Sequence, residues 1–415
     1  MVFSEIEIGK AVEAARLIIR QFLSTSPDDY RPSGYDGEME YGRGREIVYC
    51  VASLWANALA CARLIGDKPL EDALVDAFEP YRGEKRHVLA RYPHVDYSVV
   101  GIVPLEIAVL RGDERALALG LSFADAQWAE PQPDDPIPPR SPSPFESRQE
   151  WWRQGFSPET RLWIDDTYMI AALQTASFRA TGKGIYLDRA MRELSLYVER
   201  LRRPDGLYRH QAEDAPLAWG RGNGWMAAAL ALLIGCISED GRTALCSAPR
   251  SEDGRTVFGQ SGSGAAEASA IKAALCGFAS VLLRHQRSDG LWGQLVDNPA
   301  SWTESSGSAM FAFSLAEGVR LGILDAATFA PAVLRAWEGL LARLDANGNL
   351  AGTCEGTGPG DDPAYYLSRR HPNGDPHGQA AFLWLCRSML SSGLSEKAIQ
   401  NCNFGNLQAV RFRVE

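Results

Sequence analysis

The strongest constraint on the fold is the recurrence of apolar residues at helical spacing. In one window, Ala15, Ile18 and Phe22 occupy positions i, i+3 and i+7, and similar spacing returns along most of the chain. Sustained alternation of apolar and polar residues, which half-buried strands show, is hard to find. The pattern predicts an all-α protein. The predicted helices lie near residues 9–23, 45–66, 69–79, 97–111, 113–128, 165–181, 184–201, 222–237, 266–286, 303–321, 326–343 and 377–391.

Every second predicted helix opens with a polar, aromatic or glycine-rich phrase, whereas the helices between them start plainly. The phrases recur at intervals of roughly 55–80 residues, which is a helix-pair repeat. Six such pairs predict an (α/α)6 barrel of six helical hairpins, as a single domain over residues 1–415. An open solenoid would show a shorter and more regular repeat. The phrases are YDGEMEYGRGRE, YPHVDYS, WIDDTYM, WGRGNGW, SWTESSGSAM and HPNGDPHGQ.

In a closed barrel of this kind, the six inner helices begin at the same end. Their N-termini carry free backbone N–H groups and the positive ends of the helix dipoles. This mouth is therefore predicted to suit a small anionic ligand, and the phrases place polar and aromatic side chains around it.

Two segments do not fit the helix-pair repeat. Residues 130–152 hold seven of the 23 prolines and are too long for an ordinary connector. They are predicted to form a lid or surface excursion, whose final residues Trp151 and Trp152 could rim a pocket. Residues 238–264 repeat the phrase SEDGRT and are predicted to be a flexible insert without chemistry.

Charge and composition exclude several kinds of partner. The net charge of −10 argues against nucleic acid and anionic membrane. No stretch approaches about 20 uninterrupted apolar residues, so no membrane span is expected. The first residues lack the basic and apolar regions of a signal peptide. The eight cysteines form no CxxC motif and no zinc-finger spacing, which predicts reduced thiols, no metal site and a cytoplasmic protein.

The paired aspartates of WIDDTYM are the first catalytic candidates. Neighbouring helical residues point about 100° apart, so only one of Asp165 and Asp166 can face the mouth. Met169 lies one turn after Asp165 on the core-facing stripe, which predicts that Asp165 faces inward and that Asp166 caps or pairs nearby. Asp96 in YPHVDYS precedes the neighbouring inner helix. Two carboxylates in one cavity raise one pKa and make a proton donor, whereas helix capping is the purely structural alternative.

The stretch RPDGLYRHQAEDAPLAWGRGNGWM collects groups that suit a sugar acid. Arg221 offers two parallel N–H donors to a carboxylate, and Trp219 and Trp225 offer flat faces to sugar rings. His210 is one of only six histidines. The alternatives are a structural turn for the glycines and a structural role for a lone histidine.

Two further stretches contribute candidates. In TGPGDDPAYYLSRRHPNGDPHGQAAF, His377 opens the last predicted helix and Arg370 could reach an acid group, while a solvated basic loop is the alternative. In SWTESSGSAM, Glu304 could enter the pocket or simply act as a first-turn glutamate.

Taken together, WIDDTYM, WGRGNGW and SWTESSGSAMFAFSLAEGVRLGIL resemble the unsaturated rhamnogalacturonyl hydrolases, glycoside hydrolase family 105, which are relatives of the unsaturated glucuronyl hydrolases. The resemblance runs from about residue 35 to about residue 390, and the family fold is the six-hairpin barrel. It implies removal of a terminal 4,5-unsaturated uronic acid from lyase-generated oligosaccharides, of rhamnogalacturonan type above all, by hydration of the vinyl-ether double bond. It implies no metal or organic cofactor.

By motif match, the resemblance implies that Asp165 is the general acid/base and that Asp96 tunes it and holds the sugar. Protonation of an enol ether needs a neutral carboxylic acid, which predicts a raised pKa for Asp165. Thr167 stands where the family usually has leucine, and the insert and the tail after residue 392 look unlike the family, so the adjacent sugar stays open. The expected substrate-binding residues are His210, Arg221, Trp225, Trp219, Tyr41, Arg370 and His377.

Two other functions fit the same residues. One is an inverting glycosidase that cuts saturated glycosides with a second carboxylate as base. The other is a non-catalytic protein that binds uronate oligosaccharides. A homodimer is a further possibility that the sequence leaves open.

Overall fold

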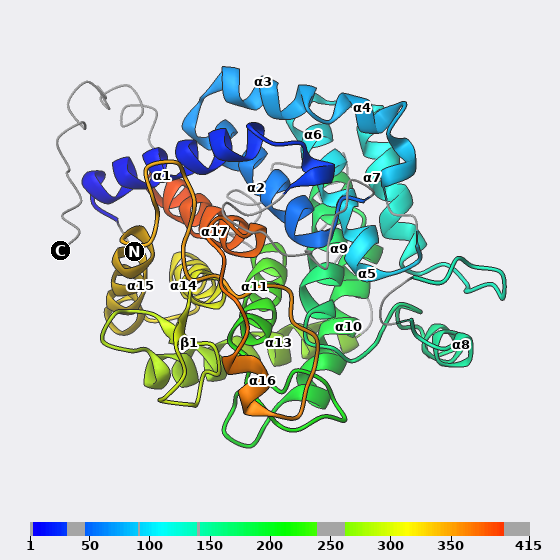
Figure 1. Ribbon diagram of the computed structural model, residues 1–415. Helices are drawn as coiled ribbons and strands as arrows, with labels where there is room; N and C mark the ends of the chain where they lie inside the picture. Colours follow the sequence, from blue (N-terminus) through cyan, green and yellow to red (C-terminus); the bar gives the residue numbers. More distant parts are fainter. Residues whose placement is uncertain (1–2, 31–45, 90–91, 139–141, 239–261, 394–415) are drawn as a thin grey trace.

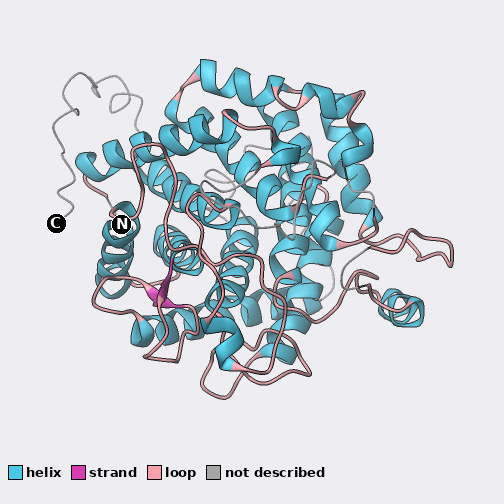
Figure 2. Ribbon diagram, in the orientation of Figure 1, coloured by secondary structure: helices cyan, strands magenta, loops and turns pink. Residues whose placement is uncertain are grey.

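The fold is nearly all helical, as Figure 1 shows. The single strand pair in the described part of the chain is β1 (Trp292–Gly293) with β2 (Thr303–Glu304), which run antiparallel (Figure 2). The computed structural model describes residues 3–30, 46–89, 92–138, 142–238 and 262–393.

Six helices form a closed inner ring. Each packs against the next around the ring, and the last packs against the first, so no gap remains. In ring order these helices are α2 (Tyr49–Ile65), α6 (Ile102–Arg111), α9 (Asp166–Thr181), α11 (Gly220–Ile237), α14 (Ser305–Arg320) and α17 (Pro376–Gly393).

Six further helices alternate with these along the chain and form an outer layer. Helix α10, for example, packs against α9 and α11, and α1 packs against α17 and α2. The arrangement is an (α/α)6 barrel, which confirms the predicted fold class. The outer helices are α1 (Glu5–Leu23), α3 (Lys68–Asp76), α7 (Glu114–Ala126), α10 (Gly184–Leu201), α13 (Gly262–His285) and α15 (Ala326–Leu341).

Inner and outer helices differ in where their apolar residues lie, because inner helices are surrounded by other helices and outer helices are covered on one face only. Helix α11 is surrounded by α9, α10, α13 and α14, and its run WMAAALAL is apolar on every side. Helix α10 is covered on one face only. It buries Tyr186, Leu187 and Leu194 and, apart from the buried Glu193, keeps its charged residues toward the other face, the usual pattern of a surface helix.

One helix in the described part of the chain, α13, is long and apolar enough over Ala266–His285 to cross a membrane by length and composition alone, which the sequence pattern did not predict. In the barrel, Ile271, Leu275 and Phe278 are buried where α13 packs against α10 and α11. The exposed side carries alanine, serine and Lys272. Small residues on the outer face therefore account for the apolar composition.

Helices α11 and α14 approach closely because glycines face each other near their starts. A Cβ added to Gly307 would lie 2.7 Å from the backbone of Gly220, and one added to Gly224 would lie 2.7 Å from the sulfur of Met310. This contact brings the first turns of two inner helices together at the mouth of the barrel.

Two predicted segments differ from the structure. The predicted helix 97–111 is divided into α5 (Val95–Ser98), the 3-10 turn η3 (Val99–Gly101) and α6. Pro104 has no backbone N–H, so it cannot donate an α-helical hydrogen bond to the carbonyl four residues before it. The regular α-helix is therefore interrupted at this junction. The predicted loop at 130–152 is helical in its last part, where α8 (Phe145–Arg153) begins directly after Pro144, the last proline of the segment.

Shorter elements complete the fold, and parts of two predicted segments lie outside the described residues. Of the predicted insert, residues 239–261 are outside, and so are residues 394–415 of the tail. The short elements are η1 (Pro27–Asp29), α4 (Glu79–Arg82), η2 (Arg86–Val88) and α16 (Pro363–Leu367).

Candidate active site

A short backbone pairing brings WIDDTYM beside the stretch that carries His210. The N–H of Ile164 donates to the carbonyl of His210 at 2.8 Å, and Trp163 forms an isolated antiparallel bridge with Gln211. Asp165 follows this pairing directly. As a result, Nε2 of His210 lies 3.2 Å from Oδ2 of Asp165.

Asp165 occupies the N-cap position of α9, yet its side chain makes no capping hydrogen bond. The residue is only 7% exposed. Among the described residues, Oδ2 of Asp165 and Nε2 of His210 are both buried without a hydrogen-bond partner, so the two atoms approach each other without hydrogen-bond alignment. Buried polar atoms of this kind indicate a place where a ligand completes the hydrogen bonding.

The pKa of Asp165 lies below its ordinary value of 3.8. Burial acts to raise this pKa, but the contact with His210 and the positive charges of His210, Arg161 and Arg221 outweigh burial. The raised pKa that we expected for Asp165 is therefore wrong for this structure. The sequence could not indicate how many cations the fold would gather around the carboxylate.

Asp166 has the opposite environment and is fully buried. Its Oδ2 accepts hydrogen bonds from the backbone N–H of Arg161 at 3.0 Å and from the Tyr197 hydroxyl at 2.7 Å. Its Oδ1 accepts a bond from Nε of Arg161 at 3.0 Å. This agrees with the predicted division, in which Asp165 faces the mouth and Asp166 pairs nearby.

Asp96 is the aspartate of the mouth whose pKa is raised. Its Oδ1 lies 3.3 Å from Nη2 of Arg161, and its Oδ2 lies 3.7 Å from Nδ1 of His94. Burial raises the pKa of Asp96 to about 6; the charge of Arg161 opposes this rise, whereas those of Asp166 and Asp165 add to it. Asp96 and Asp165 thus influence each other, as predicted, but the raised pKa belongs to Asp96, where burial is the main cause, and not to Asp165.

Arg161 links these groups and was not among the predicted site residues. Besides binding Asp166 and Asp96, its Nη1 lies 2.9 Å from Nε2 of His94. Its guanidinium also lies over the Trp163 ring, 4.6 Å from the ring centroid. The sequence held only a weak signal, a basic residue shortly before WIDDTYM, and no spacing rule distinguishes such an arginine from a surface one.

Two buried glutamates hold the segment that leads into WIDDTYM. Ser98 donates to Oε2 of Glu159 at 3.0 Å, while Thr160 donates to Oε1 of Glu193 and Ser157 donates its N–H to Oε2 of Glu193 at 3.1 Å. Burial raises the pKa of Glu159 to about 8 and that of Glu193 to about 7. At neutral pH Glu159 is therefore mainly protonated and Glu193 about half ionised, and both hold the segment through hydrogen bonds.

The His210 ring is fixed by aromatic neighbours. Its Nδ1 lies 2.8 Å from the hydroxyl of Tyr366, and the ring stacks on Trp219 with centroids 4.4 Å apart and planes at 28°. The guanidinium of Arg221 also lies over Trp219, 4.5 Å from its centroid. This packing leaves Nε2 of His210 directed to Asp165.

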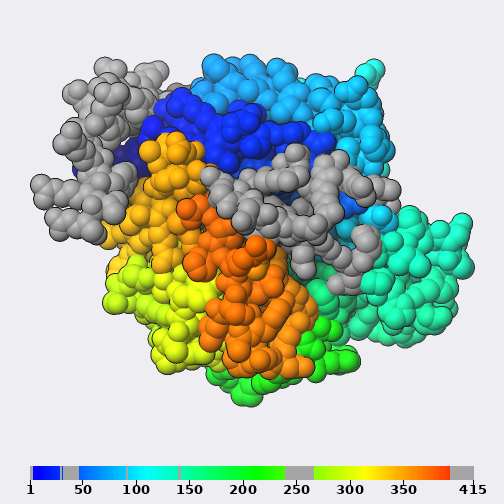
Figure 3. Space-filling view, in the orientation of Figure 1, coloured from blue at the N-terminus to red at the C-terminus, as the bar shows by residue number. Residues whose placement is uncertain are grey.

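Arg221 does not offer the free two-donor fork that we expected. Its Nη1 donates to the carbonyl of Cys354, and its Nη2 donates to the carbonyl of Glu355 at 2.7 Å. Both carbonyls belong to the long loop before α16, which forms part of the surface in orange in Figure 3. Arg221 therefore holds this loop and supplies buried positive charge, and its Nε is left without a partner among the described residues.

Trp225 and His377 lie inside the ring of inner helices. Both are almost fully buried, with ring centroids 6.5 Å apart. Nε2 of His377 lies 2.7 Å from the Tyr49 hydroxyl, and Nδ1 lies 2.6 Å from Oδ1 of Asp375. Burial, aided by the charge of Arg221, lowers the pKa of His377.

Two predicted residues remain, Tyr41 and Arg370. Tyr41 lies outside the described residues. Arg370 has a side chain that is 53% exposed, with its Nε 3.0 Å from Oε2 of Glu355. Its guanidinium is therefore engaged at the surface of the loop, and its role in binding substrate stays a prediction.

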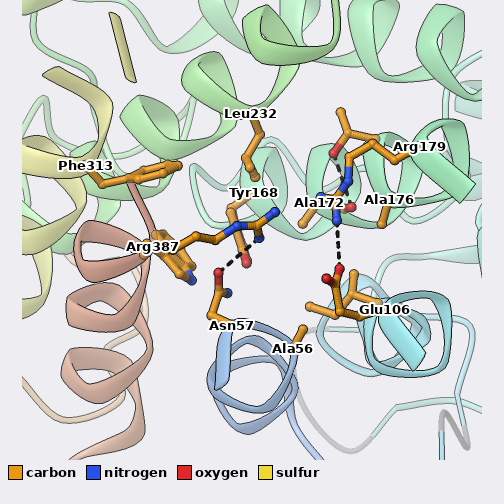
Figure 4. Close-up of a pocket in the computed structure, with 13 residues that line it drawn as sticks. Ala56, Asn57, Glu106, Tyr168, Ala172, Ala176, Arg179, Leu232, Phe313 and Arg387 are labelled. Carbon is orange, nitrogen blue, oxygen red and sulfur yellow. Dashed lines mark hydrogen bonds and ion pairs between the residues drawn. The ribbon is translucent and has the colours of Figure 1, made fainter. Parts of the chain in front are cut away.

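Figure 4 shows a separate cavity deeper in the barrel. There Arg179 contacts Glu106 at 2.7 Å, and Arg387 contacts Asn57 at 3.4 Å. Arg179 is near the end of α9, about 20 Å along the helix from Asp165 at 1.5 Å per residue. Because these polar groups bind one another, the mouth is the better candidate for chemistry.

At the mouth, one hydrogen-bond acceptor, Oδ2 of Asp165, and several N–H donors lack partners among the described residues. Besides Nε2 of His210 and Nε of Arg221, the indole N–H groups of Trp219 and Trp225 lack partners among the described residues. Helices α9 and α11 also begin here with their positive ends. No group of three His, Cys, Asp or Glu in the described part of the chain is placed to hold a metal ion. The arrangement suits a small polar anion beside a proton-transferring carboxylate.

Fold and site together define the class: an (α/α)6 barrel with a carboxylate–histidine pair at the mouth formed by its inner helices. Within that class, the family described as Glycosyl Hydrolase Family 88 matches residues 29–245 and 264–392, and the chain belongs to this family.

Individual relatives agree with this assignment. The chain is 30% identical over 156 residues to the unsaturated 3S-rhamnoglycuronyl hydrolase of Formosa agariphila, a match that covers 37% of this chain and 35% of that relative. A possible member of the GH105 family from Klebsiella pneumoniae is similar in structure, with a TM-score of 0.69 and 19% identity over 91% of this chain and 93% of that one. The unsaturated glucuronyl hydrolase of Bacillus sp. GL1 has a TM-score of 0.57 and 17% identity over 91% and 95%. The two structures establish the shared fold.

Proposed function

We propose that the protein removes a terminal 4,5-unsaturated uronic acid from oligosaccharides that polysaccharide lyases release, with rhamnogalacturonan-type fragments as its substrates. Family membership and the name of the Formosa relative support this activity. The observation that carries the proposal is the contact between Asp165 and His210, 3.2 Å apart, with both facing atoms buried and unpartnered among the described residues.

In the proposed reaction, Asp165 donates a proton to C4 of the C4=C5 double bond. Water adds at C5, and the Asp165 carboxylate takes the proton that the water loses. The resulting hemiketal opens to a ketone at C5, and the hemiacetal left at C1 releases the adjoining sugar as an alcohol. One carboxylate therefore moves both protons, as general acid and then as general base.

The lowered pKa of Asp165 is compatible with this role because the substrate is itself an anion. The contact with His210 and the positive charges of His210, Arg161 and Arg221 lower the pKa of Asp165. A uronate bound beside these cations offsets their charge and adds its own negative charge. Both effects raise the pKa of Asp165 and favour the protonated acid.

The test is an absorbance assay on unsaturated oligosaccharides made by lyase digestion of rhamnogalacturonan, with chondroitin and ulvan digests for comparison. Hydration destroys the double bond, so the ultraviolet absorbance falls. Asp165→Asn should lower turnover by about 10²–10⁴-fold, the usual contribution of a general acid. Asp325→Asn is the matched control, because Asp325 caps the outer helix α15 and asparagine also caps well.

The possible outcomes separate the alternatives. No loss of absorbance on any digest contradicts the proposed activity. Cleavage of saturated glycosides instead indicates an inverting glycosidase, and binding without turnover that Asp165→Asn leaves unchanged indicates a binding protein. Turnover retained in Asp165→Asn overturns the role of this aspartate.

We also propose that the protein works in the cytoplasm. Cys50, Cys61, Cys354 and Cys386 are buried thiols, as expected where the surroundings are reducing. Cell fractionation with an antibody against the protein tests this location, and recovery outside the cytoplasmic fraction would contradict it.

A further inference from the structure

A second hollow lies directly beside the Asp165–His210 pair, and we call it the side pocket. Its cavity volume is about 420 Å³, within the range of small-ligand sites. Residues 142–144 together with Ser147 and Trp151 of α8 form one wall. Residues 160–163 and 211–213 form the other.

The second wall of the side pocket is continuous with the candidate active site. Trp163 and Gln211 are the residues that pair across the two strand-like segments, and Asp165 and His210 lie on the same two segments. The rings of Trp163 and His210 are 6.3 Å apart. The side pocket therefore adjoins the two segments that carry Asp165 and His210.

The first wall is the excursion that the sequence predicted as a lid or surface segment, with Trp151 and Trp152 as candidates to rim a pocket. Figure 1 shows α8 at the flank of the barrel, apart from the ring. The excursion has contacts of its own, because Arg148 contacts Asp135 at 2.7 Å and the Trp151 ring packs edge-on against Phe156, 5.8 Å away. Trp151 is thus a positioned, half-buried aromatic side chain on the pocket.

The described lining favours an uncharged ligand. Ser147 and Gln211 offer neutral polar groups, and Glu213 adds an exposed carboxylate. Arg161 is the cation among the described lining residues, and its guanidinium already binds Asp96 and Asp166. A sulfated or acidic sugar in the side pocket would face the Glu213 carboxylate, and no cation of the described lining is free to pair with it. A neutral sugar ring can instead stack on Trp151.

We propose that the side pocket binds the sugar attached to C1 of the unsaturated uronate, that this sugar is uncharged, and that Trp151 is the specificity-determining residue that stacks on it. The inference rests on the proposed function. It adds a subsite built partly by α8 and the residue, Trp151, that contacts the leaving sugar there.

The experiment compares three substrates that share the unsaturated uronate. The methyl glycoside occupies only the mouth, the uronyl–rhamnose disaccharide also enters the side pocket, and a sulfated form of that disaccharide adds charge there. Trp151→Ala should lower kcat/KM for the neutral disaccharide about 10-fold and leave the methyl glycoside unchanged, because only the former loses a stacking contact. The unaltered protein should prefer the neutral disaccharide over the sulfated one by about 10-fold or more.

Trp152→Ala is the matched control, since Trp152 neighbours Trp151 on α8 but does not line the side pocket. It should behave as the unaltered protein on all three substrates. Equal losses on the methyl glycoside and the disaccharide in Trp151→Ala, or no loss on either, overturn the subsite. Equal or faster turnover of the sulfated disaccharide overturns the neutral preference. Failure of the unaltered protein on all three substrates, the methyl glycoside included, contradicts the proposed function instead.

Discussion

The two adjacent aspartates of WIDDTYM show how a step of one residue, about 100° around a helix, separates a structural carboxylate from a reactive one. Asp166 is surrounded by donors from Arg161 and Tyr197, so its charge is satisfied within the protein. Asp165 keeps one oxygen buried without a partner among the described residues. An unsatisfied buried acceptor is costly in a folded protein, and a bound ligand offsets that cost. The residue that the fold leaves unsatisfied is therefore the candidate for chemistry.

The raised pKa of Asp96 predicts a pH-dependent affinity for uronates. Its value is about 6, so Asp96 is mainly neutral below that pH and ionised above it. A uronate is ionised throughout this range, and an ionised Asp96 repels it. Affinity for saturated glucuronate, which has no double bond to hydrate, should fall roughly 10-fold as the pH rises from 5 to 8. Calorimetric titration across this range measures the effect.

Asp96→Asn removes the titrating group and provides the control for this measurement. Its affinity for glucuronate should vary little between pH 5 and pH 8. Parallel pH profiles for the variant and the unaltered protein would show that another group is responsible.

Among the elements, the pair α11 and α14 controls how the mouth is built. Their first turns meet at Gly220 and Gly307, where a side chain would strike backbone atoms. Trp219 and Glu304 are the N-cap residues of these helices, and the Glu304 carboxylate accepts the N–H groups of Ser306 and Gly307. Close helix packing and the position of the Trp219 ring that supports His210 thus depend on the same glycines.

Gly307→Ala should destabilise the protein by about 1–3 kcal/mol, because the added methyl forces α11 and α14 apart. Urea unfolding followed by circular dichroism measures the change. Gly9→Ala is the matched control: Gly9 lies within α1, and a Cβ there meets no atom within 4 Å. Alanine at this position should be neutral or add about 0.5–1 kcal/mol through helix propensity. A destabilisation by Gly9→Ala as large as that by Gly307→Ala would refute the packing explanation.

At the scale of the whole molecule, the ring closes where the last inner helix, α17, meets the first, α2. Helix α17 packs against α2, and the Cys61 thiol of α2 donates to the carbonyl of Leu383 in α17 at 3.5 Å. Burial raises the pKa of Cys61 to about 12, so the thiol is protonated at this seam at neutral pH. Because every inner helix has two inner neighbours, opening the seam exposes apolar surface on both sides.

Labelling of Cys61 should therefore report global unfolding. In a urea series at pH 8, alkylation of the peptide that contains Cys61, followed by mass spectrometry, should show the same midpoint as the loss of helical circular dichroism. Cys276, which is only half-buried, should react at lower urea and serves as the internal comparison. Labelling of Cys61 well before the helical transition would show that the seam opens independently.

Several features could be predicted from the sequence because they depend on consecutive residues. Helical periodicity and the polar phrases at alternate helix starts predicted the barrel and its inner ring. The 100° step between neighbours predicted which of Asp165 and Asp166 faces inward. Helix α8 was missed because prolines dominate the first part of its segment and hide a short run that can form a helix.

The electrostatics and shape of the mouth were decided only by tertiary structure. The pairing of Asp96 with Arg161, the use of the Arg221 fork by the loop at Cys354, and the lowered pKa of Asp165 all join groups that are distant in sequence. The side pocket likewise needs α8 to lie against residues 211–213. Periodicity is a property of neighbours along the chain, whereas charge interactions and cavities depend on distances in space, which exist only once the barrel has closed.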